Sequence, residues 1–205
     1  MAYSPNYSFK GNHNRTDYGP LNSGVRPNMR KELLNAWRDA VTESMAFSLP
    51  QFVLHNARRP GAERGMLCYS WAPTPSKKFT CFLVFRPIAS EGFDTWAGWS
   101  IDGKLPYGLE SVSSDPEDFA ASHFVLSTLE LAGRSGLVGW SFWEPSDAAI
   151  DDPGRFAQEY AEHFSKALSD SDAANLVRPA VAFAMAEIEG YCLPYFNKRA
   201  AAERL

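Results

Sequence analysis

The feature that most constrains the fold is the stretch of residues 79–101, which reads FTCFLVFRPIASEGFDTWAGWSI. Its first seven residues are almost continuously apolar and rich in aromatic side chains, which is typical of a strand covered on both faces. Residues 94–101 predict a return strand with two usable faces. Side chains alternate between the faces of a strand, so Trp96 and Trp99 fall on opposite faces. Gly92 suits the turn, since glycine adopts a positive φ without steric cost. The stretch therefore predicts a central antiparallel hairpin that the rest of the chain must cover.

Two residues are expected to disturb this hairpin. Pro87 cannot donate a hydrogen bond to a ladder, so we expect the pairing to weaken where Arg86 and Pro87 end the first strand. Gly98 stands between the two tryptophans of the return strand. A glycine inside a strand indicates either a β-bulge or a neighbouring backbone that packs close.

Three further segments predict strands that complete the sheet. Residues 51–56 and 66–71 are short runs that precede the hairpin, and with it they predict a four-stranded meander. Residues 136–143, which read GLVGWSFW, predict a fifth strand. Because a helix is expected just before it, this strand would run parallel to one neighbour or form a separate edge.

Two helices are predicted in the first two thirds of the chain. Residues 28–47 carry apolar side chains at steps of three and four, and Asn28 is placed to cap them. Residues 115–132 predict a second helix, because Asp115 suits the cap position and the following proline suits the first helical position. This helix would include His123.

The last third of the chain is predicted to be helical. A second Asp-Pro pair at residues 152–153 opens a helix with apolar residues at steps of four. Another helix is expected to begin at Ser171 or Asp172 and to be kinked or restarted by Pro179. Gly190 is the expected end of this helix, followed by a short tail.

Together these segments predict an α+β fold: an antiparallel four- to five-stranded sheet, covered mainly on one face by helices, with a helical C-terminal third. We expect residues 26–205 to form a single domain. Residues 1–25 show neither helical nor strand periodicity and are expected to form an N-terminal arm. The arm is either disordered or lies in a groove of its own domain or of a partner. Its anchors would then be aromatic rings, those of Tyr3, Tyr7, Phe9 and Tyr18.

Charge and cysteine content exclude some classes of function. A net charge of −4 and a pI near 5.6 argue against a general nucleic-acid-binding surface, which is normally basic. The three cysteines show no CxxC spacing, and Cys68 and Cys81 fall inside apolar strand patterns. This usage favours a reducing compartment, so we expect a cytoplasmic protein. We expect neither export nor a membrane span, because the sequence has no signal-peptide pattern and no apolar run of about 18 residues.

No strong catalytic or metal-binding motif is present, and no cofactor is expected. The histidines lack metal-ligand spacing, and nucleophile-elbow and phosphate-loop patterns are absent. Asp94, followed by Asp102 and Lys104, is similar to the acids and lysine of metal-dependent nucleases of the restriction-endonuclease type. That similarity implies that the acids hold a metal ion and the lysine activates water. The pattern departs from these nucleases because both acids belong to one strand and its exit.

Two groups of residues are candidate contacts for a partner. Trp96 and Trp143, predicted on strand faces opposite the helices, either belong to a large aromatic core or line a groove for a peptide or another protein. The loop of residues 57–65 is either a solvated hairpin tip or a contact for an acidic partner or a phosphate. Its cationic residues are Arg58, Arg59 and Arg64.

The chain resembles small bacterial α+β domains of unknown function, including toxin-immunity-type proteins. The resemblance rests on the first helix, the aromatic meander and the terminal segment GYCLPYFNKR, excludes the N-terminal arm and transfers no functional residues. The aromatic arm and the surplus of tryptophans favour a non-enzymatic protein-binding domain, an immunity, adaptor or assembly component whose partner is another protein. The alternative is a metal-dependent hydrolase or nuclease that uses Asp94, Asp102 and Lys104. A small-molecule-binding module is a third hypothesis.

Overall fold

The computed structural model describes residues 8–10, 29–55, 65–73, 79–88, 92–103, 122–134 and 137–202. The strands in this part are β1 (Ser8–Lys10), β2 (Val53–His55), β3 (Leu67–Trp71), β4 (Thr80–Ile88), β5 (Gly92–Ser100), β6 (His123–Ser127) and β7 (Leu137–Ser141). The helices are α1 (Lys31–Ser48), α2 (Thr128–Leu131), α3 (Asp147–Ile150), α4 (Pro153–Ser165), α5 (Asp170–Glu187), the π-helical turn η1 (Ile188–Cys192) and α6 (Leu193–Ala202).

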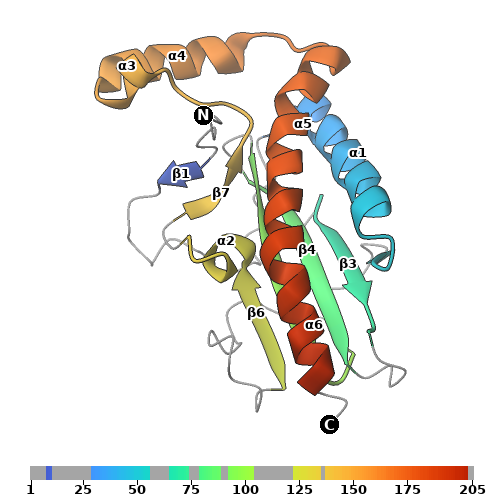
Figure 1. Cartoon of the computed structure of the whole chain (residues 1–205). Helices are drawn as coiled ribbons and strands as arrows, with labels where there is room; N and C mark the ends of the chain where they lie inside the picture. Colours follow the sequence, from blue (N-terminus) through green and yellow to red (C-terminus); the bar gives the residue numbers. More distant parts are fainter. Residues whose placement is uncertain are drawn as a thin grey trace, which may run out of the picture.

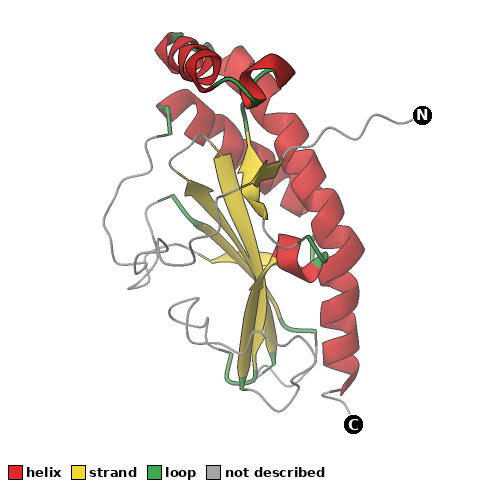
Figure 2. Cartoon of the chain, turned by 90° about the vertical axis from the view of Figure 1, so that its left-hand side faces the viewer, coloured by secondary structure: helices red, strands yellow, loops and turns green. Residues whose placement is uncertain are grey.

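The described strands form one antiparallel sheet, and α1, α5 and α6 lie on one of its faces (Figure 1, Figure 2). This arrangement confirms the predicted α+β class, the placement of helices mainly on one face and the helical C-terminal third. The sheet has seven strands instead of the predicted four or five. The two additional strands are β1 and β6, which the sequence did not predict.

Strands β4 and β5 form the centre of the sheet, as the sequence predicts. They pair along their whole lengths, from Thr80 opposite Ser100 to Ile88 opposite Gly92. β3 and then β2 follow on the other side of β4. β5 is flanked by β6 along one half and by β7 at its beginning.

The pairing does not weaken at Pro87, contrary to the prediction. Pro87 lies opposite Phe93 in the ladder, and Ile88 continues it. β3 begins at Leu67, opposite Phe85, and does not reach Pro87, so among the described strands only β5 lies beside β4 at this residue. A proline is tolerated in this edge-like position, because its missing N–H deprives no second strand of a hydrogen bond.

Both faces of the central hairpin are buried, which explains its nearly continuous apolar sequence. Cys81, Leu83 and Phe85 of β4 belong to the core that α1 and α5 cover. Phe82 and Val84, which alternate with them on the opposite face, are also buried. The helices complete the core through residues at helical spacing, which are Leu33, Trp37, Val41 and Met45 of α1 and Val177, Val181 and Ala184 of α5.

The helix predicted over residues 115–132 is wrong in the part that the structure describes. His123–Ser127, including His123 itself, form strand β6 beside β5, and only Thr128–Leu131 are helical. Long-range packing decides this segment: Phe124 lies opposite Trp99, is fully buried and stacks on its ring with 6.2 Å between centroids. The Asp-Pro pair that suggested the helix lies outside the described residues.

Gly98 is required by the pairing of β5 with β6. It lies opposite Val125 in a regular register, so β5 has no bulge at this position. A Cβ atom on Gly98 would overlap the carbonyl oxygen of Phe124. The predicted close approach of a neighbouring backbone is therefore confirmed.

The strand predicted over residues 136–143 exists as β7, but it is neither parallel to a neighbour nor a separate edge strand, the two alternatives expected for it. β7 runs antiparallel to the beginning of β5 and antiparallel to β1. β6 and β7 thus run in the same direction along one edge of β5, with α2 between them (Figure 1). β1 comes from the N-terminal arm, so residues Ser8–Lys10 of the arm extend the sheet of their own chain.

The caps of α4 and α1 differ in how well the sequence predicts them. Asp152 caps α4 as expected, accepting hydrogen bonds from two backbone N–H groups of the first turn at 2.9 and 3.1 Å. Arg30, not Asn28, occupies the cap position of α1, and Asn28 lies outside the described residues. The guanidinium of Arg30 donates to the carbonyl oxygen of Lys166 at 2.7 Å, which ties the start of α1 to the end of α4.

α5 begins with a capping box, slightly before the expected position. The Ser169 hydroxyl accepts a hydrogen bond from the Asp172 N–H, and the Asp172 carboxylate accepts one from the Ser169 N–H. The restart predicted at Pro179 is wrong, because the helix passes through it without interruption. Burial of Val177 and Val181 around it outweighs the loss of about 3 kcal/mol that an internal proline causes.

The helix end predicted at Gly190 is also wrong. The chain passes through Gly190 in η1 and continues as α6 to Ala202. In η1 the N–H of Leu193 bonds to the carbonyl oxygen of Ile188, five residues earlier. This wider turn leaves room for the ring of Pro194, which in a regular α-helix clashes with the carbonyl four residues before it.

We expect Gly98→Ala to lower the free energy of unfolding by about 1–3 kcal/mol, because the added Cβ must displace the backbone of β6. Gly190→Ala is the matched control: no neighbouring atom lies within 4 Å of its Cβ position, and alanine favours helix by up to about 1 kcal/mol. Denaturant unfolding measures both variants. Equal effects of the two substitutions would contradict the close approach of β6 to Gly98.

Candidate interaction surface

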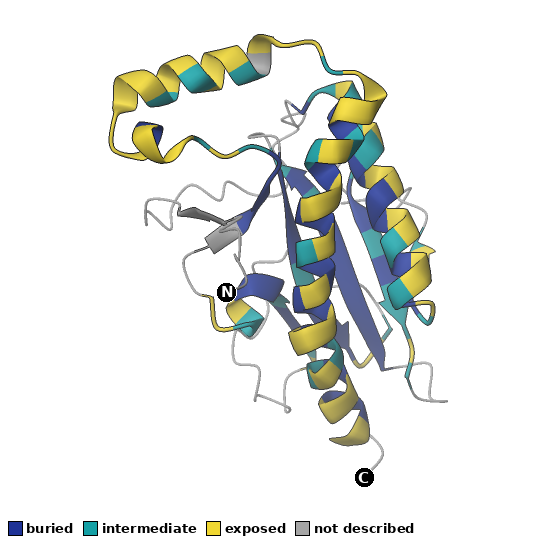
Figure 3. Cartoon of the chain, turned by 45° about the horizontal axis from the view of Figure 1, so that its top comes forward, coloured by how far each residue is buried: buried dark blue, intermediate teal, exposed yellow. Residues whose placement is uncertain are grey.

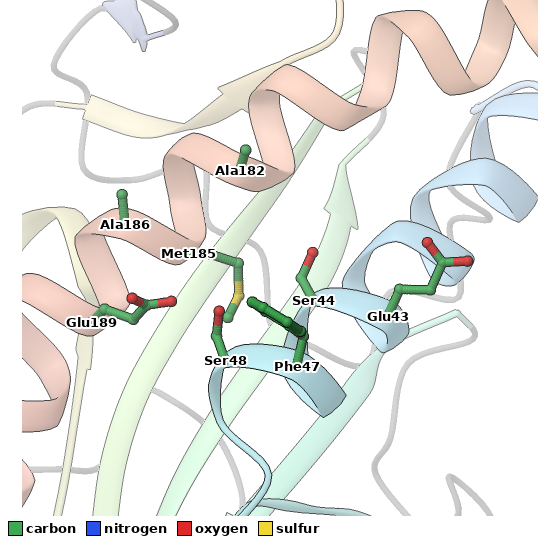
Figure 4. A pocket seen from close by; sticks show the side chains of 8 residues that line it. All are labelled: Glu43, Ser44, Phe47, Ser48, Ala182, Met185, Ala186 and Glu189. Atoms are coloured by element: carbon green, nitrogen blue, oxygen red, sulfur yellow. The ribbon is translucent and has the colours of Figure 1, made fainter.

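A groove runs along the outside of the helical layer, between α1 and α5. The two helices lie side by side over the sheet and pack on each other through buried residues (Figure 1, Figure 3). Near the end of α1 the groove widens into an open hollow of about 410 Å³. Figure 4 shows the residues that line it, which are Glu43, Ser44, Phe47 and Ser48 of α1, Ala182, Met185 and Ala186 of α5, and Glu189 of η1.

Phe47 is the most exposed large apolar residue of this hollow, with 89% of its surface accessible. The buried stripe of α1 ends with Val41 and Met45, at a step of four residues. Phe47 comes two residues after Met45, about 200° further round the helix, and therefore projects from the outer side. Phe47 is not among the contacts predicted from the sequence; the signal that reveals it is a phenylalanine placed outside the apolar stripe of an amphipathic helix.

The α5 side of the hollow is built from small residues and one long one. Ala182 and Ala186 are exposed and four residues apart, so they follow one line along the helix surface. Met185 is buried, with 4% exposure, and lies below them next to Phe47 (Figure 4). The small side chains keep the hollow open above the methionine.

Acidic side chains border the groove along its length. Glu43 lines the first hollow and also a second one of about 330 Å³, nearer the start of α5. The second hollow is lined by Glu32, Asn35, Ala36, Asp39, Ala40 and Glu43 of α1 and by Asp170, Ala174 and Arg178 of α5. The two hollows together carry five carboxylates and one guanidinium. The groove therefore has an apolar centre in the first hollow and an acidic border along its length.

The five carboxylates form neither hydrogen bonds nor ion pairs within the part of the chain that the structure describes. Two of them, Asp39 and Glu43, are four residues apart on α1. Like charges at this spacing destabilise a helix by about 0.2–0.5 kcal/mol. The border of the groove thus carries an excess of negative charge.

Trp96 and Trp143, the tryptophans predicted as partner contacts, lie in different surroundings. Trp96 is half-buried on the sheet face away from α1 and α5, with the Arg86 guanidinium 5.8 Å from its ring centroid. Trp143 follows the end of β7 and packs against α4, with its ring 5.4 Å from that of His163 and 5.8 Å from that of Tyr160. The expectation that Trp143 faces away from the helices is wrong, because α4 covers it.

The remaining predicted contacts fall outside the described residues. These are Tyr3, Tyr7, Tyr18, Arg58, Arg59 and Arg64. Phe9 lies in β1, but its side chain is not among those described. Their part in binding stays a prediction.

The structure does not bring together the acids of the nuclease-like pattern. Asp94 is buried near the start of β5, where the Arg86 guanidinium donates to both of its carboxylate oxygens at 2.5–3.2 Å. Burial raises the pKa of Asp94, and these hydrogen bonds oppose the rise. Asp102 is exposed beyond the other end of β5, about 26 Å away at 3.3 Å per residue. Lys104 lies outside the described residues.

No group of three potential metal ligands occurs among the described residues. β2 and β3 do bring the Nε2 atom of His55 into hydrogen-bond contact with the Ser70 hydroxyl. A serine nucleophile also needs donors that stabilise an oxyanion. Ser70 lies inside a ladder between β2 and β4, where backbone N–H groups serve the strand pairing. The contact is therefore explained as a cross-strand pair of the sheet.

No protein-family model, curated protein or solved structure matches the chain. Among the described helices, none combines the length and apolar character that a membrane crossing requires.

We expect Asp94→Asn to lower the free energy of unfolding by about 3 kcal/mol, because it removes the buried carboxylate charge that pairs with the largely buried Arg86 guanidinium. Asp102→Asn is expected to change it by less than about 1 kcal/mol, because Asp102 is exposed. Chemical denaturation of both variants tests this. Magnesium that raises the melting temperature of the parent protein but of neither variant would instead support a shared metal site.

Proposed function

We propose that this protein is a non-enzymatic protein-binding domain whose partner docks in the groove between α1 and α5. The observation that carries the proposal is Phe47, an aromatic side chain that is 89% exposed beside a hollow of about 410 Å³. Burying a phenylalanine side chain contributes about 1.5–3 kcal/mol, a gain that the chain alone leaves unused.

The anatomy of the groove supports docking of a protein. Phe47 and Met185 provide an apolar centre, and serine and glutamate side chains surround it. Protein interfaces have this pattern, because a polar rim excludes water from the few apolar residues that contribute most of the binding energy. The hydrolase alternative gains no such support, since Asp94 and Asp102 lie at opposite ends of β5.

The proposal includes a role and a location. The role is that of an immunity, adaptor or assembly component, in keeping with the resemblance to bacterial immunity-type domains. The N-terminal aromatic residues, the arginine-rich loop and Trp96 are proposed as further contacts. A cytoplasmic location is supported by the three cysteines, none of which forms a disulfide bond in the described part of the chain, with Cys81 and Cys192 buried.

We expect Phe47→Ala to reduce recovery of a stoichiometric partner by about tenfold or more, because it removes the apolar anchor. The experiment is a native pull-down from extracts of the source cell, with co-purifying proteins quantified by mass spectrometry. Ile150→Ala is the matched control, since Ile150 is 65% exposed on α3, outside the groove. The melting temperature of both variants is expected to stay near that of the parent protein.

Loss of one partner in the Phe47 variant, with its retention in the Ile150 variant, would support docking in the groove. A partner that both variants retain in full would overturn it. A partner that only the Ile150 variant loses would move the binding site to α3.

A further inference from the structure

We propose that the segment bound in the α1–α5 groove is a basic amphipathic helix of the partner protein. This inference rests on the proposed function and assigns the class of ligand that the groove takes. Three independent properties of the groove support it, namely its backbone chemistry, its dimensions and its charge.

The backbone chemistry favours a helical ligand over an extended one. An extended peptide gains affinity by pairing with a free strand edge. The walls of this groove are helices, whose backbone groups are already hydrogen bonded within α1 and α5. A bound helix satisfies its own backbone and needs only side-chain contacts from the groove.

The dimensions of the groove also suit a helix. Exposed small residues recur every four positions along α5 and η1, at Ala182, Ala186 and Gly190. Side chains at this spacing form one row along a helix surface, and where the row consists of small residues a second helix can pack at a short interaxial distance. The lining residues extend from Asp170 to Glu189, about 28 Å along the helix axis, which corresponds to about five helical turns.

Charge determines that the bound helix is basic. Glu32, Asp39 and Glu43 follow one another along the α1 wall, and Asp170 and Glu189 lie at the two ends of the α5–η1 wall. Among the described residues, Arg178 is the one cation that lines the two hollows. Lysine and arginine side chains of a ligand would place their aliphatic stems on the alanines of the second hollow, Ala36, Ala40 and Ala174, and their charged ends at these carboxylates. Such a ligand would also relieve the repulsion between Asp39 and Glu43.

The apolar face of the bound helix would contact Phe47 and Met185, at the end of the groove near Glu189. Large apolar side chains at helical spacing on the ligand fit this hollow, because the alanines beside it leave its opening unfilled. The specificity of the groove thus combines an apolar anchor at one end with an acidic border along its length.

Titration calorimetry of the full chain with three designed peptides of about 18 residues tests the inference. The first is an amphipathic helix of leucine and lysine, the second has glutamate in place of lysine, and the third has the composition of the first in a non-periodic order. We expect the first to bind, the second not to bind, and the third to bind at least about tenfold more weakly. Equal binding of the first and third peptides would overturn the inference, as would preference for the glutamate peptide.

Charge variants separate the groove from general attraction to an acidic protein. Glu43→Gln combined with Glu189→Gln is expected to weaken binding of the first peptide about tenfold. Asp147→Asn combined with Glu162→Gln removes the same charge from exposed positions on α3 and α4 and is expected to change it less than twofold. Equal weakening by the two pairs would contradict a basic ligand in this groove.

The native partner distinguishes failure of this inference from failure of the proposed function. A partner lost on Phe47→Ala but retained by the Glu43 and Glu189 double variant leaves docking in place and removes the basic helix. A partner retained by both variants removes both proposals. A partner that is lost from the Phe47 variant and from the Glu43 and Glu189 double variant, but is retained by the Asp147 and Glu162 double variant, supports both proposals.

Discussion

The pairing of β4 with β5 is the interaction on which the rest of the structure depends. Nine residue pairs join these strands, and the ladder is buried on both faces. A two-stranded hairpin is marginally stable in water, so its apolar faces must be covered by other elements. α1 and α5 cover one face with their buried stripes. That placement fixes which side of each helix points inward and leaves their outer sides, with the groove between them, facing solvent.

Local sequence patterns correctly predicted the helices and strands for which the local preference of the residues agrees with the packing of the folded chain. The apolar run of β4 and the stripe of α1 identify the sheet and its main helix, and Asp152 marks the start of α4 correctly. The wrong predictions concern segments whose secondary structure depends on contacts with residues far away in the sequence. β6 is a strand because Phe124 packs on Trp99, which residues near Phe124 do not reveal. Gly190 does not end the helix, because the π-helical turn η1 makes room for the ring of Pro194. Glycine and proline normally mark a helix end, and the sequence gives no sign that a wider turn accommodates them here.

The candidate site was less predictable than the fold, for a physical reason. The position of Phe47 outside the α1 stripe can be read from helical spacing alone. The hollow beside it depends on how closely α1 and α5 approach, and therefore on buried residues far apart in sequence, such as Trp37 and Val181. Trp143 shows the opposite case: its strand-like sequence suggested an open face, and α4, which follows in the chain, folds back over it.

The register of α1 links the core to the groove. Trp37, Val41 and Met45 are almost completely buried, and a rotation of α1 that buried Phe47 would expose them. The burial of these three side chains therefore keeps Phe47 on the solvent-facing side of α1. One exposed aromatic residue is ordinary on a protein surface. Here it stands above Met185 and between Glu43 and Glu189, carboxylates that form no ion pair in the described part of the chain. A partner with an apolar face and basic flanks would satisfy the aromatic ring and the carboxylates together, which the core of this fold does not do.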